Sequence, residues 1–112
     1  MNNKREIYVN LWDDYKQKPY HDHTEPTTLT IESTDKLRDS EIILLRQTII
    51  IRCLIWKEKE GEREVQFIEN DDKYNVIDIH GLDADKREKL LKHLRCDRSA
   101  FDDIEITWLM ES

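Results

Sequence analysis

Short segments in which apolar and polar residues alternate occur at four points along the chain. They are EIYVNLW at 6–12, TTLTIES at 27–33, YNVIDIHG at 74–81 and DIEITWLME at 103–111. Alternation with a period of two places one set of side chains on each face of a β-strand. These four segments are therefore predicted to be strands.

A longer apolar run, QTIIIRCLIWKEK at 47–59, is rich in β-branched residues and is apolar on both faces of an extended chain. This composition is typical of a strand at the centre of a sheet. The segment 62–69 is predicted to follow as the next strand, after a tight turn at residues 60–61. The turn sets three oppositely charged pairs across the two strands, which favours this register. The pairs are Lys59 with Glu62, Glu58 with Arg63 and Lys57 with Glu64.

The segment DADKREKLLKHLR at 83–95 has the pattern of a helix. Asp83 is suited to the N-cap, and the last turn carries basic residues, which complement the helix dipole. Its apolar residues recur at helical spacing and define one buried stripe. The segment 34–46 suits a helix or a buried strand equally, and 13–26 reads as a polar loop holding both prolines.

Together these segments predict a single α+β domain over residues 1–112. Its sheet is expected to be mainly antiparallel, with five to six strands, and its one clear helix is expected at 83–95. The chain has 112 residues, which suits one domain with one core.

The charge of the chain narrows the classes of partner. The formal net charge is −7, which disfavours direct binding to nucleic acid or to an anionic membrane. There is no signal-peptide pattern and no apolar run of roughly 20 residues. We therefore expect a cytoplasmic protein in which Cys53 and Cys96 are reduced thiols.

The negative charge is concentrated in two segments. Residues 58–72 hold seven acidic and two basic residues, and residues 97–112 hold five acidic and one basic residue. An acidic face of this kind can imitate nucleic-acid phosphates and capture a protein partner with a basic surface. The predicted face consists of the acids without an expected cross-strand partner, namely Glu60, Glu69, Asp71, Asp72, Asp102 and Asp103.

The leading hypothesis is a non-enzymatic inhibitor of the immunity or phage counter-defence type. It would block a basic, perhaps nucleic-acid-binding, surface of its partner. No cofactor and no catalytic residues are predicted under this hypothesis. A further alternative is an accessory subunit of a larger complex, with the apolar segment 47–56 buried in an interface. The oligomeric state is left open by the sequence.

The other alternative is a metal-dependent or acid–base enzyme. His21 and His23 lie two residues apart, a spacing that puts both rings on one side of an extended segment. Asp78 and His80 have the same spacing on a predicted strand, where the carboxylate could orient the imidazole. The histidine segment lies between two prolines and is read here as a polar loop rather than a metal site.

Overall fold

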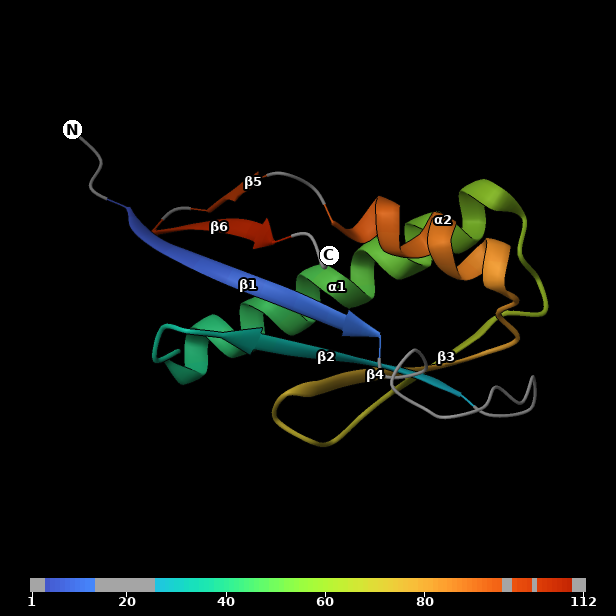
Figure 1. The fold of residues 1–112 in the computed structure, drawn as a ribbon, viewed down its shortest axis with the longest axis horizontal. Coiled ribbons are helices and arrows are strands. Elements are labelled where there is room, and N and C mark those ends of the chain that lie inside the picture. The colour runs from blue at the N-terminus through green and yellow to red at the C-terminus, as the bar shows by residue number, and fades with distance from the viewer. Residues whose placement is uncertain (1–3, 14–25, 96–97, 102, 110–112) are drawn as a thin grey trace.

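The structure is a computed structural model that describes residues 4–13, 26–95, 98–101 and 103–109. These residues form two helices and six strands, which are labelled in Figure 1. Their order is β1 (Arg5–Asp13), β2 (Thr27–Ser33), α1 (Asp39–Glu60), β3 (Gln66–Glu69), β4 (Asn75–His80), α2 (Ala84–Leu94), β5 (Arg98–Ala100) and β6 (Ile104–Leu109). The predicted α+β class is confirmed.

All six strands form one sheet in the order β3-β4-β2-β1-β6-β5. Only the pair β1 and β6 is parallel, and the other four pairs are antiparallel. The prediction of a mainly antiparallel sheet with five to six strands is therefore confirmed. The four alternating segments form β1, β2, β4 and β6, since in each of them the apolar set lies on the buried face of the sheet.

The predicted central strand at 47–59 is wrong, because these residues belong to α1. The hairpin around 60–61 is wrong for the same reason, and its charged pairs do not face each other across two strands. Of the predicted partner strand, only Gln66–Glu69 is a strand. The ambiguous segment 34–46 contributes the first two turns of the helix, from Asp39 onward.

The ends of α1 explain why a β-branched run forms a helix of 22 residues. At its start the carboxylate of Glu41 accepts a hydrogen bond from the backbone N–H of Arg38 at 2.8 Å. At its end Gly61 has φ +65° and ψ 31°, the left-handed conformation that terminates many helices. Lys57 and Lys59 lie in the last turn, where the dipole favours positive charge.

The predicted helix at 83–95 is confirmed as α2. The side chain of Asp83 accepts a hydrogen bond from the backbone N–H of Lys86 at 2.8 Å, as an N-cap should. Gly81 makes the turn from β4 into α2 at φ +87°, and a Cβ there would lie 2.8 Å from the carbonyl oxygen of Glu64. A side chain at position 81 would therefore meet both backbone strain and a steric clash.

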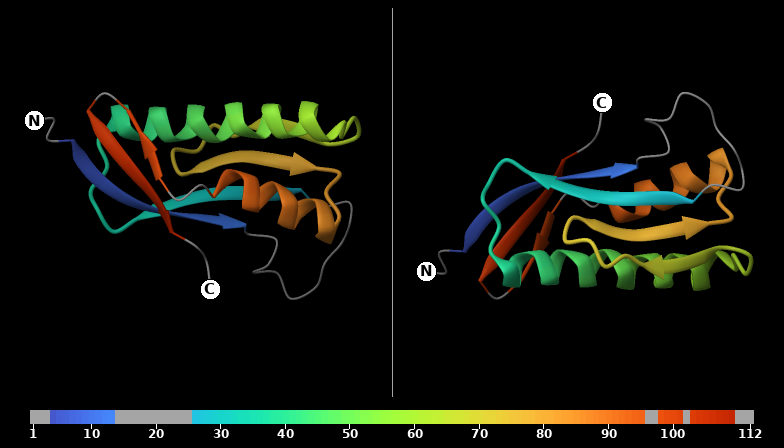
Figure 2. Two further views of the ribbon diagram at one scale, coloured as in Figure 1. Left: turned by 90° about the horizontal axis from the view of Figure 1, so that it is seen from above. Right: turned by 90° about the horizontal axis from the view of Figure 1, so that it is seen from below.

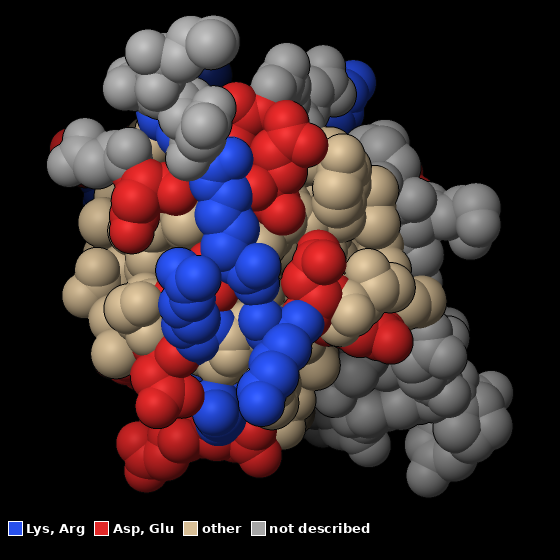
Figure 3. Space-filling view, turned by 90° about the vertical axis from the view of Figure 1, so that its left-hand side faces the viewer, with Lys and Arg blue, Asp and Glu red and all other residues tan. Residues whose placement is uncertain are grey.

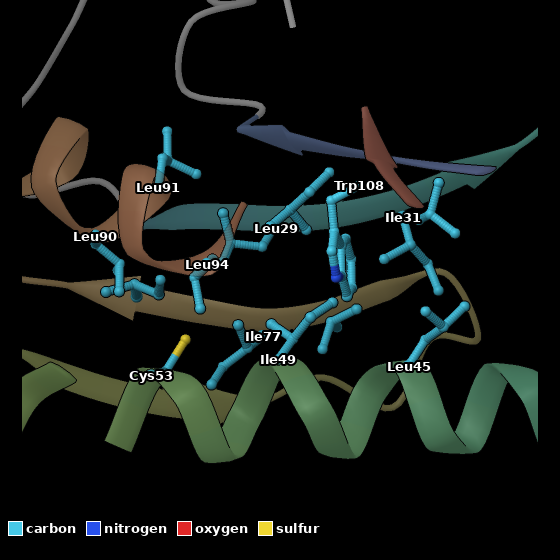
Figure 4. Packing of buried hydrophobic residues seen from close by; sticks show 14 of the residues in the cluster. Leu29, Ile31, Leu45, Ile49, Cys53, Ile77, Leu90, Leu91, Leu94 and Trp108 are labelled. Carbon is cyan, nitrogen blue, oxygen red and sulfur yellow. The ribbon is translucent and has the colours of Figure 1, made fainter. Parts of the chain in front are cut away.

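Both helices pack on the same face of the sheet, as the two views in Figure 2 show. Figure 4 shows the core between α1, α2 and the strands. From α1 the core receives five buried side chains spaced three or four residues apart, the period of one helix face. They are Ile42, Leu45, Ile49, Cys53 and Trp56.

Candidate functional site

The solvent side of α1 carries large aliphatic residues among its polar ones. Four of its aliphatic side chains are more than half exposed, at 52–56%. They lie on one side of the helix over about 18 Å. We call this set the outer stripe; it consists of Ile43, Ile51, Leu54 and Ile55.

The turn from β3 to β4 borders the outer stripe and is held against α1 by Arg46. The guanidinium of Arg46 donates to the carbonyl oxygens of Asp72 at 2.5 Å and Asn75 at 3.0 Å, and also to that of Asn70. This turn is fixed from the helix side, since one side chain serves several carbonyl groups. The acidic residues of the turn therefore have a defined position beside the first half of α1.

The predicted acidic residues are divided among separate places. Glu69, Asp71 and Asp72 are exposed in or beside the β3–β4 turn, and Glu69 and Asp71 line a shallow depression together with Ile43 and Asp39. Glu60 is the last residue of α1, about 21 Å along the helix from Arg46.

Asp103 lies at the opposite side of the sheet, just before β6. It is exposed, and its backbone carbonyl oxygen accepts a hydrogen bond from the backbone N–H of Arg5 at 3.1 Å. Asp102 lies outside the described residues. Of the five predicted residues that the structure describes, only Glu69, Asp71 and Asp72 are neighbours, so these five share no single surface.

The end of the molecule where α1 begins is of mixed charge. Figure 3 shows Lys and Arg side chains gathered at its centre with Asp and Glu side chains around them. Arg5 contacts Glu41 at 2.7 Å, and Lys73 contacts Asp39 at 3.0 Å. The contact with Asp39 raises the pKa of Lys73 by hydrogen bonding and charge. A phosphate-like acidic surface is therefore absent from this described end.

Glu41 links α1 to β1 from a nearly buried position, with its side chain 3% exposed. Burial works to raise the pKa of Glu41. The hydrogen bond from the backbone of Arg38 and the adjacent guanidinium of Arg5 outweigh that effect, so the pKa is lowered. The charged carboxylate therefore supports the fold here.

Asp78 and His80 lie on the sheet face opposite the helices, where each is partly exposed. The carboxylate of Asp78 accepts a hydrogen bond from the hydroxyl of Thr28 at 2.6 Å and lies 3.4 Å from the amide nitrogen of Asn70. These contacts give Asp78 a structural role between β2, β4 and the β3–β4 turn. The acid–base hypothesis stays a prediction.

His21 and His23 lie outside the described residues. Asp13, at the border of that segment, is fully buried and lies 3.3 Å from the guanidinium of Arg87. Arg87 also donates to the hydroxyl of Thr27 at 3.1 Å. Within the described part of the chain, no group of three or more His, Cys, Asp or Glu side chains is placed to hold a metal ion.

Cys53 is free and fully buried on the inner side of α1. Burial raises the pKa of its thiol to about 12, so the reactive thiolate is scarce at neutral pH. The described part of the chain contains no helix with the length and apolar character needed to cross a membrane.

Models of known protein families, the curated proteins and the solved structures were all compared with this chain, and none matched.

The outer stripe was missed when 47–59 was interpreted as a strand. In a strand, Ile51 and Leu54 would point to opposite faces, whereas in α1 they lie on one side. The signal that could have found it is the set of helix-end residues, with acids at 39 and 41, lysines at 57 and 59, and a glycine at 61.

Proposed function

We propose that this protein acts by binding another protein, and that the outer stripe is its contact surface. The observation that carries the proposal is the exposure of four large aliphatic side chains on one side of α1. Burying apolar surface stabilises a complex by about 25 cal/mol per Å². Contiguous apolar surface on a small protein is typical of an interaction site.

The rigidity of α1 supports this assignment. The helix is anchored along its inner side by the core, at its start by Glu41, and near its middle by Arg46. A surface that is already ordered loses little conformational entropy on binding. The outer stripe therefore has the properties of a preformed interface, flanked on one side by the acidic turn at 69–72.

The direct experiment is photo-crosslinking from a position inside the outer stripe. A photoreactive amino acid at Ile51 is expected to give discrete protein adducts in cells that naturally produce the protein. The matched control carries the same group at Lys89, an exposed residue of α2 with 63% side-chain exposure. Equal adduct patterns at positions 51 and 89, or none at 51, would contradict the proposal.

A second candidate is the inhibitor hypothesis, in which acidic residues capture a basic and possibly nucleic-acid-binding surface. It is favoured by the exposed carboxylates of Glu69 and Asp71 beside the outer stripe. Capture by charge should give an on-rate that falls steeply with salt, because the Debye length shrinks from about 30 Å at 0.01 M to about 10 Å at 0.1 M. Binding that is insensitive to salt and to Glu69→Lys/Asp71→Lys would rule out this candidate.

A further inference from the structure

We infer that the outer stripe binds a second copy of this chain, with the two α1 helices packed antiparallel about a twofold axis. The inference rests on the proposed function, because it names the partner of the same surface. Two features of α1 lead to it: the symmetry of its apolar positions, and the opposite charge of the surfaces beside its two ends.

The outer stripe is symmetric about the middle of the helix. In a twofold contact, residue i of one copy meets residue j of the other, and j meets i. Taking residue 49 as the centre places Ile43 opposite Ile55, and it places the half-buried Leu44 opposite Leu54. Every exposed aliphatic residue of the two pairs therefore meets an aliphatic residue of the other copy.

The centre of the contact follows the same pattern. Gln47 falls opposite Ile51, so the amide can lie across the aliphatic side chain while its polar end reaches solvent. Ser40 falls opposite Glu58, and both are exposed. The two positions are 18 residues apart, which is five helical turns, so they lie on the same side of α1 as the stripe.

One edge of α1 is bordered by acidic residues near the start of the helix and by basic residues near its end. Near its start, Asp39, Glu69 and Asp71 border the depression that contains Ile43, together with Arg46 and Lys73. Asp39 pairs with Lys73 at 3.0 Å and Glu69 lies 3.7 Å from Arg46, so Asp71 carries the excess negative charge of this region. Near its end, Lys57 and Arg63 border the depression that contains Leu54, together with Glu58 and Glu62. The acid Glu62 of that second region is paired with Lys86 at 2.9 Å, which leaves its basic residues less neutralised.

An antiparallel twofold arrangement brings these two regions together. The acidic region of one copy lies against the basic region of the other, and this contact occurs twice. A parallel twofold pair would instead put the two acidic regions at the same height on opposite edges of the contact, so the acidic region of one copy would not meet the basic region of the other. The charges therefore favour the antiparallel arrangement and a second copy of the same chain.

The size of the contact sets its strength. Residues 39–58 of α1 extend over about 29 Å, and a helix is about 10 Å wide. The resulting footprint is well below the roughly 800 Å² per partner of a standard stable interface. We therefore expect a reversible dimer that dissociates on the order of micromolar concentrations.

Sedimentation of the purified protein from about 1 to several hundred µM is the first experiment. The wild type is expected to pass from monomer to dimer, and Leu54→Lys is expected to stay monomeric with unchanged circular dichroism. Lys89→Ala is the surface control and should dimerise as the wild type does. A wild type that is monomeric throughout, or a Leu54→Lys dimer of wild-type affinity, would overturn the inference.

Charge reversal tests the orientation. Asp71→Lys and Arg63→Glu are each expected to weaken the dimer about threefold to tenfold, since each alters two symmetric contacts. The double variant restores opposite charges across the interface and should recover most of the affinity. If the double variant is weakened by the product of the two single effects, the two residues do not meet and the arrangement is wrong.

Cross-linking separates antiparallel from parallel helices. In a Cys96→Ser background, Cys53 is buried and unreactive, so introduced cysteines report alone. Ser40→Cys/Glu58→Cys should form dimers with a short bismaleimide, whereas Ser40→Cys alone should not, because its two copies lie about 27 Å apart along the axis. Efficient cross-linking of the single variant would indicate parallel helices and overturn the inference.

The two proposals fail separately in these experiments. A monomer at every concentration that still forms adducts with a different protein through position 51 would overturn the dimer and keep the binding function. A monomer that forms no adducts from position 51 would overturn both.

Discussion

The inner and outer sides of α1 both carry large aliphatic residues, but these residues have opposite environments. Leu45 and Ile49 on the inner side are 0% and 1% exposed, whereas Leu54 and Ile51 on the outer side are 52% and 56% exposed. All four are large aliphatic residues of the same helix. The fold explains the inner residues, whereas the outer residues stay exposed in it. This difference is the basis on which we propose a binding partner for the helix.

The largest expected effect on stability comes from replacing leucine by alanine on the inner side of α1, and the same replacement on the outer side is its control. Leu45→Ala should lower the free energy of unfolding by about 2–5 kcal/mol, because it removes buried contacts and leaves a cavity. Leu54→Ala, the matched outer change, should alter it by about 0.5 kcal/mol or less under dilute conditions. Urea denaturation at low micromolar protein concentration checks both. Equal losses would mean that the outer side is covered within the monomer.

The start of α1 should give the next largest effect. Glu41→Gln should cost about 1–3 kcal/mol, since a buried carboxylate that accepts hydrogen bonds from Arg38 and Arg5 loses its charge. The pKa of Glu41 is lowered from its ordinary value of 4.5 in the folded protein. Its contribution is therefore present above pH 4.5 and is lost as pH falls through the folded pKa.

A pH series of urea denaturation curves tests this assignment. The wild type and Glu41→Gln should differ most near neutral pH and converge in acid. A constant difference across the series would show that the charge of Glu41 contributes nothing.

A smaller effect should distinguish two acids beside the outer stripe. The carboxylate of Asp72 accepts backbone N–H groups of Tyr74 at 3.1 Å and Asn75 at 3.4 Å. Asp72→Ala should therefore cost about 1 kcal/mol. Asp71→Ala should stay within about 0.5 kcal/mol. Thermal melts of the two variants make the comparison, and a larger loss in Asp71→Ala would contradict this view of the turn.

The same result decides which acids can be reversed without harming the fold. Glu69, Asp71 and Asp72 are all exposed. However, Asp72 holds the turn that Arg46 fixes from the other side, so its reversal would disturb the structure as well as the charge. Glu69 lies 3.7 Å from the guanidinium of Arg46, so Asp71 is the better choice for binding experiments.

The sequence was sufficient for the alternating strands and for α2. In β1 and β2 every second residue is apolar and lies on the one buried face of the strand. In α2 Asp83 identifies the N-cap, and the spacing of the leucines identifies the side that faces the core. Each of these elements buries only one face, so the pattern of apolar residues along the sequence matches the pattern of burial in the structure.

Helix α1 could not be predicted in the same way, because both of its sides are apolar and its β-branched residues favour a strand. Its buried residues do have a helical period, from Ile42 to Trp56, but the outer stripe obscures that period. The outer stripe itself is defined only by what the fold leaves uncovered. Local sequence does not contain that information.

Methyl NMR with a soluble paramagnetic probe tests the central claim most directly. The δ1 methyl groups of Ile42 and Ile49 report the inner side of α1, and those of Ile43, Ile51 and Ile55 report the outer side. The inner methyls should be protected at every concentration. The outer methyls should relax strongly in dilute protein and become protected as the protein is concentrated or its partner is added. Outer methyls that stay equally accessible under all these conditions would contradict the claim that this face is an interface.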